Sequence, residues 1–593
     1  MNRNISKVIT LLVLFAMVFT MAACGASKDN TGTTQATEAT QAATTAAAAE
    51  EPPVTLKYWI AYDGLLTPGV HNDPIMQEFT KQTGVILDFE ANLTVELYNA
   101  KLASGDLPDI MTFWTRDVKN LVDGGNLIDM EPLLAKYGQD IVSDKGKVEF
   151  GKQFLSVGQN KLFAIPSWSL GLDAQPVKSF DQGSGIGLYL RWDIYKEVGY
   201  PEMTGDITNI IPILKQMQDK YPTAADGKKV YGLSPWFGEW DLWNFTIYYQ
   251  GYDNKSAEGN GFLDIDVRTN AMTSQIMDTN STLWKGAKFY NKAYQAGVLD
   301  PDSLMQKYDQ TVEKYKAGRA LMGPCNWNVA GGTAAYAKAG HPEQGYMEIK
   351  PSSDYKMIGN LYKNPFTDRW AQAITKACRE PEKAMKALNF LNSKDGMRLL
   401  LNGIEGVNWK LDSNGIPKWT DEMKKLHKEG TPQDLEAAGF GCYTHLYGYA
   451  ENSWDSKYNC QAMFKFNEDP TELMATATQL QKDYTEHYKV AYPDQVMEQA
   501  LPDQKVIFDG SFQQMVEPTP TDIKAIDDKL LNYLKINLVG AIPSKTDAEF
   551  EAQQKRIIDE CKAMGAEKAA KWHMDAIKAA MSKMDAFCKA IGK

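Results

Sequence analysis

The 593-residue chain has few of the residues from which catalytic and metal centres are built. It contains seven cysteines and six histidines, and the histidines never pair at metal-ligand spacing. It has no HExxH, GxSxG or Walker A motif. These absences exclude zinc proteases, hydrolases and P-loop nucleotidases of the kinds that such motifs define. Glycoside hydrolases stay open, because their two carboxylates need not be close in sequence.

The chain is also short of positive charge and of long apolar runs. It has 63 lysines and arginines against 75 acidic residues, a net charge of −12, which disfavours capture of nucleic acid or of an anionic membrane. No apolar run of membrane-spanning length follows the N-terminal region. What remains is a globular composition, 44% hydrophobic and 23% charged, with enough apolar mass for several domains. Tryptophan is abundant, at 14 copies.

The N-terminus has the order of a secretory signal. Arg3 and Lys7 precede an apolar run over 8–19, and small residues then lead to Cys24. We expect residues 1–23 to be removed, a membrane-spanning anchor being the alternative. Residues 24–53 are rich in Ala and Thr, have no aromatic residue and predict a disordered tether.

The body alternates predicted strands and helices. Strands are expected at 54–60, 84–89, 109–114, 162–166 and 187–192. Helices are expected at 73–82, 94–103, 206–221, 282–296, 310–317, 380–392 and, in pieces, 547–588. Strand, helix and strand in succession are typical of a parallel α/β sheet.

Two sets of residues carry a family resemblance. Met21-Ala-Ala-Cys-Gly25 resembles a bacterial lipobox. Seven further blocks, in the order in which the family has them, resemble family 1 extracellular solute-binding proteins. They are Ala103-Ser-Gly-Asp-Leu-Pro-Asp-Ile110, Gly125-Asn-Leu-Ile-Asp-Met-Glu-Pro-Leu133, Lys161-Leu-Phe-Ala-Ile-Pro-Ser-Trp168, Leu188-Tyr-Leu-Arg-Trp-Asp-Ile-Tyr-Lys-Glu-Val-Gly199, Lys316-Ala-Gly-Arg-Ala-Leu-Met-Gly323, Pro381-Glu-Lys-Ala-Met-Lys-Ala-Leu-Asn-Phe-Leu391 and Asn402-Gly-Ile-Glu-Gly-Val-Asn-Trp409. Within that family the chain is most similar to the large lipoprotein receptors of carbohydrate ABC importers.

The resemblance implies an α/β fold of the two-lobe periplasmic-binding-protein type II kind, with several hinge crossovers and a helix-rich C-terminal extension. We expect residues 54–184 and 345–402 in the first lobe, and 185–344 and 403–593 in the second. It further implies a monomeric, non-enzymatic receptor without a cofactor, which captures an oligosaccharide and delivers it to importer permeases. Cys24 would carry a diacylglycerol that anchors the protein to the extracellular face of a bacterial cell membrane.

A sugar site needs flat aromatic rings with hydrogen-bonding groups beside them. Candidates lie just past predicted strand ends, where ligands bind in open α/β sheets. From the first lobe they are Trp59, Asp63, Trp114, Arg116 and Trp168, and from the second Arg191, Trp236, Glu239, Trp240 and Trp327. The same reasoning extends to Trp370 and Trp409. The alternative for each is core packing or an ordinary ion pair.

Two further expectations concern metals and thiols. Relatives often carry a calcium-binding acidic loop, but here 219–232 supplies only Asp219 and Asp226 as carboxylates, so we expect no metal. The cysteines after Cys24 are expected to be mostly buried thiols, one disulfide being possible, and most histidines to be solvated. A cell-surface glycoside hydrolase or lyase, and a receptor for a peptide or other solute, remain alternative functions.

Overall fold

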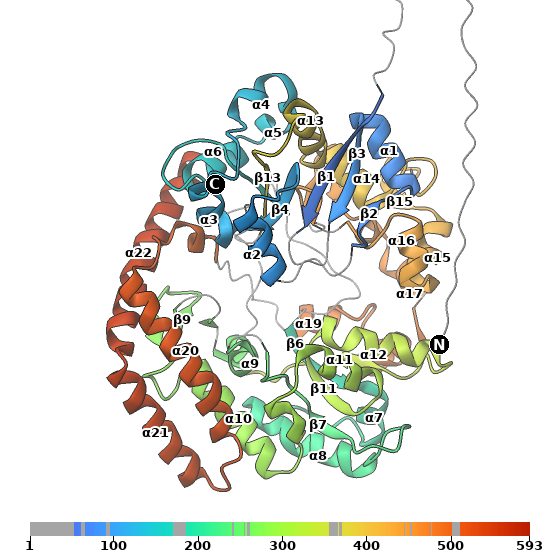
Figure 1. The fold of residues 1–593 in the computed structure, drawn as a ribbon. Coiled ribbons are helices and arrows are strands. Elements are labelled where there is room, and N and C mark those ends of the chain that lie inside the picture. Colours follow the sequence, from blue (N-terminus) through green and yellow to red (C-terminus); the bar gives the residue numbers. More distant parts are fainter. Residues whose placement is uncertain are drawn as a thin grey trace, which may run out of the picture. The chain divides into compact units, whose positions relative to one another are not determined.

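The computed structural model describes residues 52–60, 66–90, 95–169, 186–239, 242–253, 255–257, 261–354, 366, 370–443, 445–450, 453–475, 477–500 and 510–592. Residues 52–593 form one compact unit (Figure 1). The signal and tether expected before residue 52 lie outside the described residues, as does Cys24.

The first sheet is six-stranded and mixed. Its strands, in spatial order, are β2 (Gly69–Val70), β3 (Val85–Glu90), β1 (Val54–Ile60), β4 (Ile110–Trp114), β13 (Trp370–Ile374) and β5 (Ile165–Ser167). β1 pairs in parallel with β3 and β4, as the strand–helix–strand pattern predicts. β13 returns from far along the chain and runs antiparallel to both β4 and β5.

Two hydrophobic clusters cover the faces of this sheet. Because side chains alternate along a strand, Tyr58 joins one cluster and its neighbour Trp59 joins the other. The first cluster holds helices α1 (Pro74–Thr83), α13 (Pro381–Leu391) and α14 (Lys394–Asn402). Asp73 caps α1 by accepting hydrogen bonds from the N–H groups of Ile75 and Met76, which is why the helix starts where it does.

Shorter helices connect the strands of this sheet. They are α2 (Val95–Ser104), η1 (Thr115–Asp117), α3 (Val118–Asp123), α4 (Glu131–Tyr137), α5 (Gln139–Ser143) and α6 (Lys145–Phe154).

The second sheet has four strands in the order β12 (Tyr346–Glu348), β6 (Ile186–Arg191), β11 (Ala320–Cys325) and β7 (Tyr231–Leu233). Helices between and after these strands are α7 (Trp192–Glu197), η2 (Ile207–Asn209), α8 (Ile210–Lys220), α9 (Trp243–Asp253), α10 (Thr282–Gln295), η3 (Pro301–Leu304), α11 (Tyr308–Lys316) and α12 (Asn326–Lys338). A small sheet of β10 (Met272–Ser274), β9 (Leu263–Asp266) and β8 (Lys255–Ser256) is inserted before α10. α9 and α10 approach so closely that Gly286 has no room for a side chain.

The rest of the chain is mainly helical. It begins with two hairpins, one of β14 (Trp409–Leu411) and β15 (Pro417–Trp419), the other of β16 (Trp454–Asp455) and β17 (Cys460–Gln461). Helices α15 (Asp421–Glu429) and α16 (Pro432–Ala437) lie between the hairpins in the chain, and η4 (Phe464–Asn467) and α17 (Pro470–Ala475) follow the second one. There follow α18 (Gln479–Tyr488), α19 (Gln495–Ala500), η5 (Gly510–Met515), α20 (Thr521–Ala541), α21 (Asp547–Ala563) and α22 (Ala566–Ala590). The last three helices pack against one another, which agrees with the helix-rich C-terminal extension (Figure 1).

The packing of two segments differs from the expected lobe boundaries. β12 was expected with the first sheet, but it pairs with β6 in the second. Residues 409–464 were expected with the second lobe, but their buried side chains, Trp409, Phe440 and Leu446 among them, join the cluster around β1 and β3. The division into two lobes itself stays a prediction.

Candidate functional site

Three strand ends of the first sheet bring aromatic rings together. Trp114 ends β4 and Trp370 begins β13, and the antiparallel register sets the two residues opposite each other. Their rings stack with centroids 4.3 Å apart and planes inclined by 30°. Trp370 is also opposite Ser167, so Trp168 follows at the same edge. The edge therefore unites two of the predicted tryptophans, Trp114 and Trp168, through Trp370.

His445 completes this group. Its ring lies 4.3 Å from that of Trp370, and the ring of Trp168 meets it edge-on at 6.5 Å. We call Trp114, Trp370, His445 and Trp168 the aromatic edge. Trp370 is buried, whereas the other three are half-buried. Most of the histidines were expected to be solvated, and His445 is half-buried against Trp370.

The backbone at Trp168 is strained, with a φ of +54° that residues other than glycine rarely adopt. Two hydrogen bonds hold it, from the N–H of Trp168 to the carbonyl of Tyr447 at 3.4 Å and from that of Ser169 to the carbonyl of Gly448 at 3.0 Å. Strain of this kind persists only where the surroundings enforce it. The segment 445–450 thus fixes the orientation of Trp168.

The aromatic edge has the chemistry to bind a ring with one apolar face and polar substituents. Its indole rings offer flat apolar surface. The indole N–H groups of Trp114 and Trp168 are buried and have no acceptor among the described residues. The guanidinium of Arg116 lies 5.0 Å from the centre of the Trp114 ring, and its side chain is exposed. Arg116 therefore lies beside the aromatic edge, and its part in ligand binding stays a prediction.

The predicted residues near the second sheet separate into exposed and buried ones. Trp327 lies in the first turn of α12 and is 47% exposed, so its ring is open to a ligand. Trp236 is fully buried and packs edge-on against Tyr308 at 5.1 Å. Glu239 accepts a hydrogen bond from the N–H of Tyr308 at 3.0 Å and so caps α11.

Two other candidates are engaged inside the protein. Trp59 is 1% exposed, and the ammonium of Lys101 covers its ring at 4.7 Å. Arg191 is buried, forms two hydrogen bonds to Asp193 at 3.0 and 2.7 Å, and donates to the hydroxyl of Tyr336. Like Trp236, these side chains serve packing and local ion pairing in this structure. Asp63 and Trp240 lie outside the described residues.

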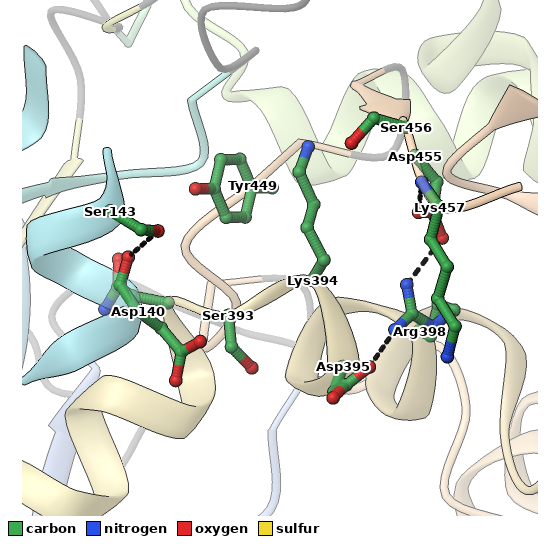
Figure 2. A pocket seen from close by; sticks show the side chains of 11 residues that line it. Asp140, Ser143, Ser393, Lys394, Asp395, Arg398, Tyr449, Asp455, Ser456 and Lys457 are labelled. Atoms are coloured by element: carbon green, nitrogen blue, oxygen red, sulfur yellow. Dashed lines mark hydrogen bonds and ion pairs between the residues drawn. The ribbon is translucent and has the colours of Figure 1, made fainter. Parts of the chain in front are cut away.

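A polar cavity of about 200 Å³ lies near the start of α14 (Figure 2). Figure 2 shows Lys394 beside the ring of Tyr449, its ammonium 4.1 Å from the ring centre. The carboxylates on the other side of the cavity are neutralised, since Arg398 bridges Asp395 and Asp455. The cavity is smaller than most organic-ligand pockets, which span ~300–1,000 Å³.

The described part of the chain contains neither a metal-binding cluster nor a disulfide. Within the described ranges no group of three or more His, Cys, Asp or Glu side chains is placed to hold a metal ion. In the loop with two carboxylates, Asp219 pairs with Lys215 and Asp226 with Arg319. No disulfide links the cysteines of the described part, and all but Cys378 are buried. None of the helices described above has the length and apolarity needed to cross a membrane.

This chain is similar to a known protein family in sequence and to solved structures in fold. The family model for bacterial extracellular solute-binding proteins matches residues 71–398, more than half of the chain. No curated protein sequence matches it.

Solved structures share its fold. The Streptococcus pneumoniae ABC-transporter substrate-binding protein FusA in complex with kestose is 15% identical, with a TM-score of 0.58 over 89% of this chain and 100% of that one. Alginate-binding protein AlgQ2 without calcium ion is 17% identical, with a TM-score of 0.56 over 89% and 99%. An HMO-binding, ABC-transporter-associated solute-binding protein from Bifidobacterium longum infantis is 14% identical, with a TM-score of 0.55 over 89% and 99%.

These likenesses confirm the α/β fold class expected from the sequence. The matched range 71–398 contains six of the seven sequence blocks in full, and only the block at 402–409 lies beyond it. The chain belongs to the family of bacterial extracellular solute-binding proteins.

Proposed function

We propose that this protein is the receptor of an ABC importer that captures an oligosaccharide, releases it unchanged to the permeases and has no enzymatic activity. The aromatic edge carries the proposal, because the half-buried indole rings of Trp114 and Trp168, with the exposed guanidinium of Arg116 beside them, match the apolar face and the hydroxyl rim of a sugar. Family membership supports the receptor role. Solved proteins of the same fold that bind kestose, alginate and HMO support a sugar as the ligand.

The exposed ring of Trp327 is the second contact in this proposal. A sugar that touches both Trp114 and Trp327 would favour a closed state of two lobes by its higher affinity for that state. Closure is then the signal that the permeases read. In the same proposal Cys24 is lipidated and holds the monomeric receptor at the outer face of the cell membrane, with residues 24–53 as tether.

A thermal-shift screen of the purified protein tests the ligand class. The panel contains kestose, alginate oligosaccharides, a high-mannose N-glycan and a peptide mixture. A ligand at 100 times its Kd adds about 2.7 kcal/mol to the free energy of unfolding, which a melting curve resolves. We expect at least one glycan, and no peptide, to raise Tm. A peptide that raises Tm while every glycan fails would reject the sugar.

Variants locate the site. For the glycan that binds, Trp114→Ala and Trp327→Ala should each weaken Kd at least about tenfold, which corresponds to ~1.4 kcal/mol. Trp572→Ala is the matched control, since Trp572 is half-buried on α22 and packs edge-on against His573 at 4.9 Å. Equal affinity of all three variants would refute the site. New reducing ends after incubation with glycans would instead reveal a glycoside hydrolase or lyase.

A further inference from the structure

A buried lysine sits behind the aromatic edge. Lys147 of α6 is 0% exposed and donates hydrogen bonds to the side-chain oxygen of Asn392 and to the carbonyl of Gly448, both at 3.0 Å. Its ammonium also lies 3.8 Å from the centre of the Tyr449 ring. An ammonium has three N–H groups, and these three neighbours account for them.

The Gly448 carbonyl joins Lys147 to the strained tryptophan. This one oxygen accepts from Lys147 and from both the N–H and the hydroxyl of Ser169, each at 3.0 Å. Ser169 follows Trp168 directly, and a β-bridge links Ser169 to Tyr449. Gly448 approaches Asn392 so closely that a Cβ would lie 2.2 Å from the Asn392 side-chain oxygen. Gly448 therefore lies tightly against Asn392, while its carbonyl accepts hydrogen bonds from Lys147 and Ser169.

The Asn392 side of the lysine leads to the other end of the same segment. Asn392 donates to the side-chain oxygen of Gln372 at 2.8 Å, and Gln372 donates to the carbonyl of Leu446 at 2.7 Å and to the hydroxyl of Tyr58 at 3.0 Å.

The chain of contacts then reaches the edge itself. Tyr58 shares a hydrogen bond of 2.9 Å with Thr112, which donates to the carbonyl of His445 at 3.2 Å. All these polar side chains are buried, and buried networks with every member bonded fix one conformation. The segment 445–450 lies outside the range matched by the family model, whereas Lys147, Gln372 and Asn392, which support it, lie within that range.

We propose that Lys147 is a positioning residue for the ligand site: through Gly448 and Asn392 it holds segment 445–450, and with it His445 and Trp168, in the conformation that binds sugar. The proposal rests on the proposed function. Without these hydrogen bonds the strained backbone at Trp168 relaxes, and restoring it on binding then costs part of the binding free energy.

Five groups face the Lys147 ammonium: the Tyr449 ring, the amide of Asn392, the carbonyl of Gly448, the carboxylate of Asp144 and the ammonium of Lys394. Asp144 accepts a hydrogen bond from the Tyr449 hydroxyl at 3.3 Å. Burial first, and then Lys394, lower the pKa of Lys147 to about 7, while Asp144 opposes this. A solvated lysine binds its proton more tightly, so falling pH between 9 and 7 favours release of Lys147 from its site.

Three full-length variants test the proposal. Lys147→Met keeps an unbranched side chain one atom shorter and removes the donors, and Lys147→Gln keeps two donors without the charge. Lys152→Met is the matched control on the same helix, where Lys152 pairs with Glu131. Proteins labelled with 5-fluorotryptophan report the environment of Trp168 by ¹⁹F NMR, its resonance being assigned with Trp168→Phe. Glycan Kd is measured by calorimetry from pH 7 to 9.

We expect Lys147→Met to shift the Trp168 resonance and weaken the glycan at least tenfold, and Lys147→Gln to recover most of that affinity. Wild-type affinity should weaken as pH falls from 9 to 7, and that of Lys147→Gln should not change. Lys152→Met should match wild type throughout. If Lys147→Met does not fold, Lys147→Gln and the wild-type pH profile decide.

Lys147 variants with wild-type resonance and Kd, and a flat pH profile, would overturn the proposal, even if they lower Tm. If no glycan binds wild type, the proposed function fails. The Trp168 resonance of Lys147→Met then still tests the positioning role, since a shift supports it and an unchanged resonance rejects it.

Discussion

The buried ammonium of Lys147 makes the stability of the protein depend on pH in a predictable direction. In the folded protein burial lowers its pKa from 10.5 to about 7. The unfolded chain retains the ordinary value, so between these two pH values the unfolded state binds more protons. The free energy of unfolding must therefore rise with pH across this interval.

The magnitude follows from the two pKa values. Below pH 7 the lysine is charged in both states and the cost of burying the charge is complete, whereas above pH 10.5 it is neutral in both and the cost has vanished. Each pH unit inside the interval changes the free energy of unfolding by about 1.4 kcal/mol. From pH 6 to pH 9 the gain from this one group is therefore ~2–3 kcal/mol.

Urea unfolding followed by tryptophan fluorescence at pH 6, 7, 8 and 9 measures this effect. Other titrating groups cancel in the difference between wild type and Lys147→Met, because the variant lacks only the buried amine. The free energy of unfolding of wild type minus that of Lys147→Met should rise by ~2–3 kcal/mol from pH 6 to pH 9. In the control Lys152→Met the missing amine pairs with Glu131, which raises the pKa of Lys152, so this lysine stays charged in both states up to pH 9 and the difference from wild type should stay constant.

A difference between wild type and Lys147→Met that is flat from pH 6 to pH 9 would refute the reasoning. It would mean that the amine ionises in the folded protein as it does in water. A difference that moves in favour of the variant as pH rises would contradict the sign of the argument.

Two further predictions concern packing. The substitution Arg398→Met should lower the free energy of unfolding by about 3–5 kcal/mol, because Asp455, whose side chain is 0% exposed, then keeps a buried charge without its partner at 2.7 Å. Urea unfolding measures the loss, and a loss below about 1 kcal/mol would contradict the prediction. Gly286→Ala should lower Tm strongly, since the new Cβ would lie 1.6 Å from the carbonyl oxygen of Phe245. Gly540→Ala on α20, where nothing lies within 4 Å, is its control and should raise stability by ~0.5–1 kcal/mol; equal melting of both variants would refute the clash.

Local patterns predicted the elements well. The first strand was predicted at its observed bounds, 54–60, because alternation of side chains is a local signal. The helix expected at 380–392 is α13, with Pro381 in its first turn. Partners were harder to predict: the apolar positions of 409–464 indicate that a face is buried, but not against which sheet.

The same limit explains the candidate site. A tryptophan at a strand end looks alike whether it faces solvent or the core, and only the neighbouring elements bury Trp59 and Trp236 while leaving Trp327 open. His445 lies in a segment without a strand or helix of its own, so no periodicity placed it beside Trp370. Arg191 was predicted from its position, but Asp193, two residues later, already engages its guanidinium.

The late return of β13 also constrains how the chain folds. β5 ends at Ser167 and finds its sheet partner among the described strands only in β13, which begins at Trp370. Until residues 370–374 pair, β5 has no partner among the described strands, β4 lacks one of its two neighbours, and the first sheet has open strand edges. Completing this sheet therefore requires contacts between residues far apart in the chain, and such long-range pairing slows folding.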